Sequence, residues 1–97
     1  MPAYVIAEIA ISDPAEYDKY RPLAAASIAR HGGRFAVRGG KVSLLEGSPE
    51  PQRVVLIEFP DAAAARRWYE SSDYQEAIKI RLSASTGRLF IVEGASG

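Results

Sequence analysis

Four stretches of the chain carry the hydrophobic patterns of β-strands, namely residues 3–11, 34–38, 54–59 and 88–93. In the first, Val5, Ala7, Ile9 and Ile11 face one way, and Tyr4, Ile6, Glu8 and Ala10 face the other. Both sides are largely apolar, so we expect both to be covered. Residues 54–59 are apolar except for Glu58, which is typical of a central strand, and Pro60 ends that strand because proline cannot donate to a sheet ladder.

Alternation within residues 34–38 predicts that Phe35 and Val37 share one face of the second strand. Arg34, Ala36 and Arg38 then share the other face. The pair Gly39-Gly40 indicates a bend or bulge. We expect residues 41–45 to continue as strand, and residues 46–52 to form an exposed loop because they are rich in Gly, Pro and Ser.

A helix is predicted after the first strand, with Asp13 as its cap, Pro14 at its first position and Glu16 closing a capping box. Its inner stripe is Tyr17, Tyr20, Ala24, Ile28 and His31, and the pair Gly32-Gly33 ends it. Pro22 removes a backbone hydrogen bond within this helix, so we expect a kink or a restart near Arg21.

A second helical region follows Pro60, with Asp61 as its cap and with Trp68 and Tyr69 pointing inward. Residues 71–73 interrupt it, and Ser72 with Gln75 predicts a second capping box. The inner stripe of the second piece is Tyr74, Ala77, Ile78 and Leu82, and Thr86-Gly87 is the predicted end.

The order strand, helix, strand, strand, helix, strand predicts one α+β domain over residues 1–97 with a ferredoxin-like fold. Its four-stranded antiparallel sheet is covered by helices on one face. The central strands are apolar on the other face too, and soluble monomers rarely expose such a patch. We therefore expect a homodimer that packs sheet against sheet.

The amino-acid composition argues against several kinds of binding partner. Lys plus Arg and Asp plus Glu both total 12, so no net charge attracts nucleic acid or an anionic membrane. The chain has no cysteine, and its amino terminus lacks the basic start of a signal peptide, which favours a cytoplasmic location. No apolar run is long enough to span a bilayer. With a single histidine and no metal-binding loop, we expect neither a metal site nor a cofactor.

Several segments together resemble the family catalogued as domain of unknown function 1330. They are HGGRFAVRGG (residues 31–40), VVLIEFPD (54–61), WYESSDYQEA (68–77) and RLFIVEG (88–94). The resemblance implies a dimeric α+β barrel, an architecture shared with small monooxygenases of antibiotic biosynthesis, haem-degrading enzymes and muconolactone isomerases. It does not imply any one of these activities, because one fold hosts many chemistries.

His31 is the only side chain whose ordinary pKa lies near neutrality. One interpretation is a general base, or an axial haem ligand as in some barrels of this superfamily. The other is a helix C-terminal residue whose ring interacts with the last carbonyl groups of the helix.

Alternation also predicts that Arg34, Arg38, Glu8 and Glu58 meet over one face of the sheet. In the functional interpretation, a guanidinium group binds a carboxylate or enolate ligand while Glu58 transfers a proton. In the structural interpretation, the four side chains form ion pairs within a dimer interface.

Aromatic side chains on the predicted helices, Tyr17, Tyr20, Trp68, Tyr69 and Tyr74, are spaced for the core, where a hydroxyl group could also orient a ligand. Two hypotheses follow. The chain is a cofactor-independent enzyme, oxygenase-like or isomerase-like, that acts on a small organic acid or phenolic compound. Alternatively, it is a non-catalytic dimeric module that binds a small metabolite or has a structural role.

Overall fold

The computed structural model describes residues 1–95 of the chain. Its elements, in order, are β1 (Ala3–Ile11), α1 (Pro14–Arg30), β2 (Arg34–Arg38), β3 (Arg53–Phe59), α2 (Ala62–Glu70), α3 (Ser72–Ala84) and β4 (Ser85–Glu93). The predicted order is confirmed, with α2 and α3 as the two pieces of the second helical region. No helix in these residues is both long and apolar enough to cross a membrane.

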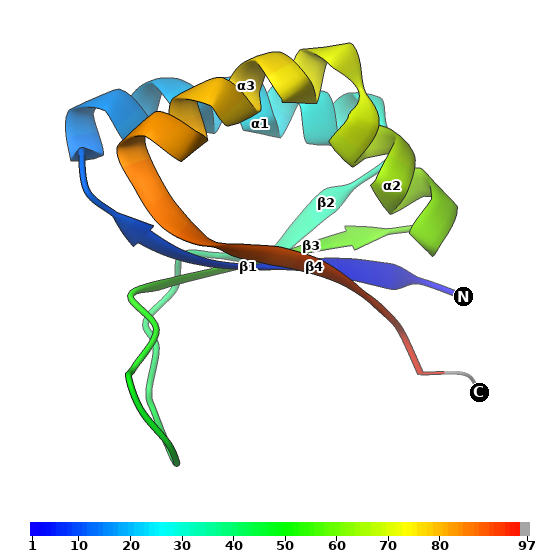
Figure 1. Cartoon of the computed structure of the whole chain (residues 1–97). Coiled ribbons are helices and arrows are strands. Elements are labelled where there is room, and N and C mark those ends of the chain that lie inside the picture. Colours follow the sequence, from blue (N-terminus) through cyan, green and yellow to red (C-terminus); the bar gives the residue numbers. More distant parts are fainter. Residues whose placement is uncertain (96–97) are drawn as a thin grey trace.

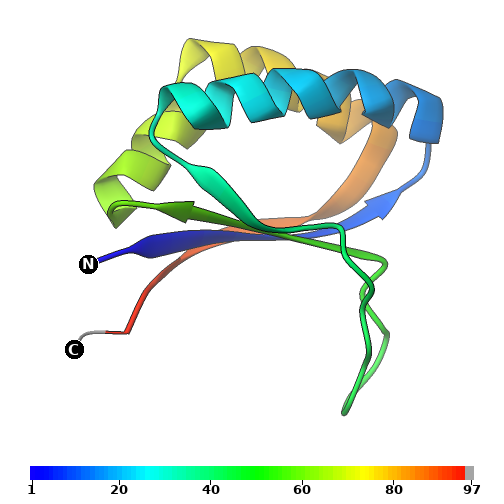
Figure 2. The same cartoon turned by 180° about the vertical axis from the view of Figure 1, so that it is seen from behind.

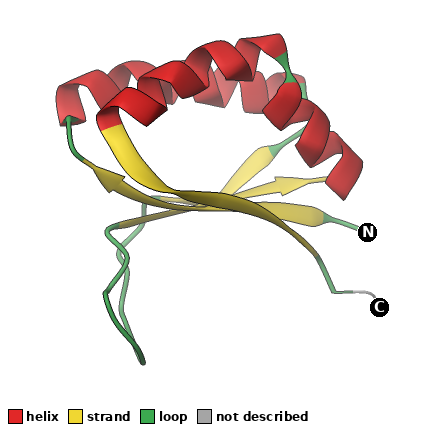
Figure 3. Ribbon diagram, in the orientation of Figure 1, coloured by secondary structure: helices red, strands yellow, loops and turns green. Residues whose placement is uncertain are grey.

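The four strands form one antiparallel sheet in the order β2-β3-β1-β4. All three helices cover the same face of this sheet (Figure 1 and Figure 3). The predicted ferredoxin-like α+β fold is therefore confirmed. The segment between β2 and β3 extends away from the sheet on the side opposite the helices (Figure 2). We call the helix-covered side of the sheet the inner face and the other side the outer face.

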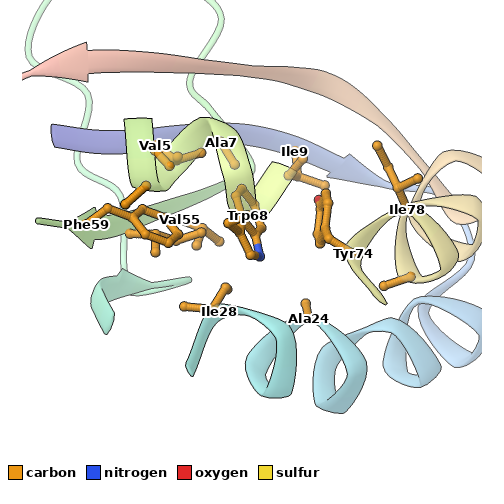
Figure 4. Close-up of a cluster of buried hydrophobic side chains, with 14 of the residues drawn as sticks. Val5, Ala7, Ile9, Ala24, Ile28, Val55, Phe59, Trp68, Tyr74 and Ile78 are labelled. Carbon is orange, nitrogen blue, oxygen red and sulfur yellow. The ribbon is translucent and has the colours of Figure 1, made fainter. Parts of the chain in front are cut away.

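The core lies between the inner face and the helices. Alternate residues of β1 and β3 are buried there, because successive side chains of a strand point to opposite faces. Trp68 of α2 is at the centre of this core, with its ring centroid 5.5 Å from that of Phe59 and 4.1 Å from that of Tyr74 (Figure 4). Its indole N–H donates to the Ser27 hydroxyl of α1 at 3.0 Å, so the buried polar group is satisfied.

The predicted N-caps of α1 and α2 are present. Asp13 accepts from the Glu16 amide at 3.1 Å, and Asp61 accepts from the Ala64 amide at 2.7 Å. The capping box at α1 is not closed, however. The Asp13 amide donates to the carbonyl of Ala84 at 3.1 Å, so Glu16 is not needed there and its carboxylate pairs with Lys19.

Pro22 does not restart the helix, and α1 runs unbroken from Pro14 to Arg30. Pro22 and Asp18 are both exposed, so water can reach the carbonyl that proline leaves without a donor. Other boundaries also differ from expectation, among them the start of β4 at Ser85 rather than at residue 88. Ser71 rather than Ser72 caps α3, and α3 ends at Ala84, before Thr86-Gly87. Residues 41–45 are not strand and belong to the long β2–β3 connection.

The predicted inner stripe of α3 was wrong at one position. Leu82 is 64% exposed, whereas Arg81 is only 6% exposed and points into the core. Tyr69, expected to point inward, is 39% exposed on α2. Residues 81 and 82 both lie within one turn of Ile78, so spacing alone does not decide between them. The rotation of α3 against the sheet does, and it buries the arginine.

Candidate functional site

A β-bulge in β2 separates the two arginines that were expected to share a face. Arg34 pairs with Glu58 and Phe35 with Ile57, but after Ala36 the register shifts, so that Val37 pairs with Leu56 and Arg38 with Val55. Val55 and Ile57 are buried on the inner face. Arg34 therefore lies on the outer face and Arg38 on the inner face, because the extra residue reverses the alternation.

The predicted four-charge cluster is accordingly wrong in its membership. On the outer face Arg34 donates to the Glu58 carboxylate at 3.0 Å, and Arg88 of β4 donates to the Glu8 carboxylate at 3.2 Å. Arg88 thus takes the position expected for Arg38. Both pairs are partly exposed, and the sheet separates Glu58 from the helices.

His31 is the residue that ends α1. Its Nδ1 lies 2.9 Å from the carbonyl oxygen of Ser27, one turn earlier in the helix. This is the contact expected of a histidine at a helix C-terminus. His31 does not line the cavity described next.

A cavity of about 40 Å³ lies between the inner face of the sheet and the helices. Its helical lining comes from α1, from Trp68 of α2 and from Arg81 of α3. Four of the predicted ligand-binding residues line this cavity, namely Tyr17, Tyr20, Trp68 and Arg38. Tyr74 lies behind the lining, where its hydroxyl is 2.8 Å from that of Tyr20. Arg34 and Glu58, predicted for the same site, are on the other side of the sheet.

Arginine is the main charged residue of this cavity. Besides Arg38, the side chains of Arg21, Arg53 and Arg81 line it, whereas no Asp, Glu or His of residues 1–95 does. Arg21 is neutralised by Asp18, at 2.8 Å. Arg38, Arg53 and Arg81 form no ion pair within the described part of the chain.

The most buried of these side chains, Arg81, contacts the Tyr74 hydroxyl but has no carboxylate partner and no acceptor for its Nε within residues 1–95. The Nε atoms of Arg81 and Arg53 are both inaccessible to solvent and have no hydrogen-bond acceptor within residues 1–95. Leaving a buried charge unpaired is strongly unfavourable, so such groups are rare unless they serve a site. Gly39 adds to the arrangement, because a Cβ at this position would collide with the Arg53 guanidinium group, and its φ of 71° also favours glycine.

Aromatic rings hold the guanidinium groups in place. Arg38 lies over Phe35 at 4.4 Å, and Arg53 lies over Tyr17 at 5.8 Å. The ring of Tyr17 is 5.3 Å from that of Tyr20, whose hydroxyl contacts Tyr74. Burial raises the pKa of both Tyr20 and Tyr74 above the ordinary value for tyrosine. Both hydroxyl groups are therefore neutral, and since one donates to the other, one donor of the pair remains for a further partner.

This arrangement is suited to binding and stabilising an anion. Guanidinium groups present a planar fork that a carboxylate matches with two hydrogen bonds, and a neutral tyrosine adds a donor. The cavity lacks a general base of its own within residues 1–95, and no cluster of His, Asp or Glu that could hold a metal occurs in that part of the chain.

Three of the four cavity arginines were missed in the sequence, and two of them carried a usable signal. Arg53 continues the inward alternation of Val55 and Ile57, although it was read as the residue before the strand. Arg81 is spaced three and four residues from Ile78 and Ala77, as an inward residue of α3 should be. Arg81 was missed because the more hydrophobic Leu82 was assigned to the inner stripe instead.

Comparison with solved structures shows the same fold. RPA0582, a protein of unknown function from Rhodopseudomonas palustris, matches with a TM-score of 0.80 and 20% identity over 99% of this chain and 84% of its own. SnoaB, a cofactor-independent oxygenase from Streptomyces nogalater, matches with a TM-score of 0.70 and 18% identity over 99% of this chain and 95% of its own.

Rv0793 from Mycobacterium tuberculosis also matches, with a TM-score of 0.60 and 17% identity over 100% of this chain and 98% of its own. These identities are low, so the structures establish the fold and leave the activity open. No curated protein sequence matches the chain. The model of one sequence family, described as Domain of unknown function (DUF1330), matches residues 2–95. The chain therefore belongs to the DUF1330 family, as the sequence motifs predicted.

Proposed function

We propose that the protein binds a small organic acid in the arginine-lined cavity. The observation that carries this proposal is Arg81, a guanidinium group 6% exposed, with an unpartnered Nε and no carboxylate of residues 1–95 in the cavity around it. An anionic ligand supplies the missing charge and the missing acceptors together. Its binding therefore relieves a cost that the free protein carries.

The dimensions of the cavity suit a small ligand. Its enclosed part, about 40 Å³, has room for roughly three water molecules or one carboxylate group. The cavity is also partly open to solvent. A carboxylate can thus reach Arg81 while the rest of the molecule extends toward the exposed side chain of Arg38.

Catalysis is the second candidate. It is supported by the fold shared with SnoaB, a cofactor-independent oxygenase, and by the Tyr20 hydroxyl beside a cluster of positive charge. Such a site stabilises an enolate or phenolate. Because no acid or histidine of residues 1–95 lines the cavity, the substrate must itself carry an acidic proton, as a phenolic compound does. A protein without this reactivity would remain a binding module.

We also propose that the protein acts as a homodimer. The outer face carries the half-buried apolar side chains of Ile6, Leu56 and Phe90, and no helix covers them (Figure 1). A second copy would cover this patch. The two ion pairs of the outer face, Arg34–Glu58 and Arg88–Glu8, place both charge signs there, so two copies can meet without net repulsion.

Binding is tested by calorimetric titration of the wild type with butyrate and with benzoate at constant ionic strength. Arg81→Met should abolish the binding of both acids, since it removes the buried guanidinium group. Arg34→Met is the matched control, because Arg34 lies on the outer face, and it should bind as the wild type does. Equal affinity of Arg81→Met and wild type for these acids would refute the proposed site.

A further inference from the structure

The arginines of the cavity without an ion pair in residues 1–95 differ in depth, and we call the buried Arg81 its inner end and the half-buried Arg53 with the exposed Arg38 its outer end. At the inner end Arg81 projects from the face of α3 that also carries Tyr74, two turns earlier in the helix. At the outer end Arg53 lies over Tyr17, and Arg38 lies over Phe35. Tyr17 and Tyr20 form a row that links the two ends. Arg53 lies over Tyr17, the ring of Tyr17 is 5.3 Å from that of Tyr20, and the Tyr20 hydroxyl meets that of Tyr74, which contacts Arg81.

One monoanion cannot balance these charges. Arg38, Arg53 and Arg81 form no ion pair within the described chain, and Arg21 is already paired with Asp18. A single carboxylate at Arg81 leaves the buried Nε of Arg53 without an acceptor. A second acid group at the outer end would provide that acceptor and a second negative charge.

The wall between the two ends is apolar. Ala7, Val55 and Leu89 contribute the sheet side of the lining, and Ala24 and Ile28 contribute the α1 side. A polar middle section of a ligand would lose its hydrogen bonds to water there without replacement. A short hydrocarbon section fits such a wall.

We infer that the ligand is a small dicarboxylic acid, with one carboxylate at Arg81, a short apolar spacer along the tyrosine row, and the second carboxylate at Arg53 and Arg38. This inference rests on the proposed function and specifies the ligand class of the same cavity. The two carboxylates would differ in their exposure to solvent. The inner carboxylate is enclosed, whereas the outer one stays near solvent, because Arg53 is half-buried and Arg38 is exposed.

The experiment compares acids of equal carbon number. Succinate, glutarate and adipate are titrated calorimetrically against butyrate, valerate and hexanoate at neutral pH and constant ionic strength. The best dicarboxylate should bind about tenfold or more tightly than its monocarboxylate partner, a ratio equivalent to roughly 1.4 kcal/mol. The preferred chain length reports the separation of the two ends.

Two variants test whether Arg53 and Arg38 bind the second carboxylate. Arg53→Gln should reduce the affinity for the dicarboxylate to that for the monocarboxylate, which itself should change little. Arg38→Gln should also reduce the preference, and it keeps the assignment testable if Arg53→Gln fails to fold, because Arg38 is exposed. Arg67→Gln, an exposed position of α2 outside the cavity, is the control and should retain the preference.

The outcomes separate the inference from the proposed function. If monocarboxylates bind as tightly as dicarboxylates, the inference is overturned while acid binding stands. If the preference survives in both Arg53→Gln and Arg38→Gln, the assignment of the outer end is overturned. If none of the six acids binds to the folded wild type, the proposed function fails and the inference fails with it.

Discussion

At the scale of the residue, Arg81 is the position where stability and function oppose each other. Its neighbours on the inner side of α3, Tyr74, Ala77 and Ile78, are all buried, so an apolar side chain would be the stable choice there. A charged group persists at such a position only if something other than stability retains it. Binding an anion is the reason that the surrounding chemistry supports.

Stability therefore tests the interpretation of Arg81 without any ligand. Arg81→Met should raise the free energy of unfolding by about 1 kcal/mol or more, because it replaces a buried unpaired charge with an apolar side chain of similar length. Urea denaturation of the ligand-free protein measures the change. A loss of stability instead would mean that the guanidinium group has partners that stabilise the fold.

At the scale of the element, local capping decides where the helices begin. Asp13 caps α1 with its side chain, while its own amide donates to Ala84 at the end of α3. The start of α1 is thus tied to the junction between α3 and β4. A change at Asp13 affects both the helix and that contact between distant parts of the chain.

Asp13→Ala should lower the free energy of unfolding by about 1 kcal/mol, because the Glu16 amide loses its acceptor. Asp13→Asn retains a capping oxygen and should recover most of the loss. Ser12→Ala is the control, since the Ser12 side chain makes no hydrogen bond within residues 1–95. Denaturation midpoints for the three variants provide the comparison, and an unchanged midpoint for Asp13→Ala would show that the cap contributes nothing.

The bulge at Ala36 also acts at this scale. It sends Arg34 and Arg38 to opposite faces of the sheet, so one short strand serves an ion pair on the outer face and the cavity on the inner face. Bulges commonly redirect a side chain near a functional site. Here the bulge supplies the cavity with the arginine at its mouth.

At the scale of the whole molecule, the sheet is covered on one side only. The exposed residues Val37 and Val92, 39% and 43% exposed, extend the apolar outer face toward both edges of the sheet. Soluble monomers seldom leave an apolar patch of this extent in contact with water. The proposed homodimer would bury it.

Sedimentation should show a dimer at micromolar concentration. Leu56→Asp, in the middle of the outer face, should shift the protein toward the monomer, because it places a charge within the proposed interface. Leu82→Asp is the control, since Leu82 is exposed on α3, away from the sheet. A folded wild-type monomer at this concentration would refute the dimer.

Much of the fold could be read from the sequence because its signals are local. Strand alternation, the Asp13 and Asp61 caps and the stop at Gly32 each depend on a few neighbouring residues. All four strands and all helical pieces appear in the predicted order, although residues 41–45 are not strand and the junction between α3 and β4 lies earlier than predicted. The motifs of the DUF1330 family pointed to the same architecture. The predicted restart at Pro22 is an exception, since α1 continues through it and water can reach the exposed carbonyl of Asp18.

Only part of the candidate site could be predicted from the sequence, because the direction in which several of its side chains point depends on packing. Helical spacing was enough to place Tyr17 and Tyr20 on the inner side of α1, and it directed Trp68 inward although not Tyr69 outward. Strand pairing, which no local signal fixes, brings Arg38 to the cavity and keeps Arg34 and Glu58 away, since a bulge shifts the register between two strands. The tertiary structure also decided that Arg81 rather than Leu82 is buried, because the rotation of α3 is set by its contacts with the sheet and α1 and by no residue of α3 alone.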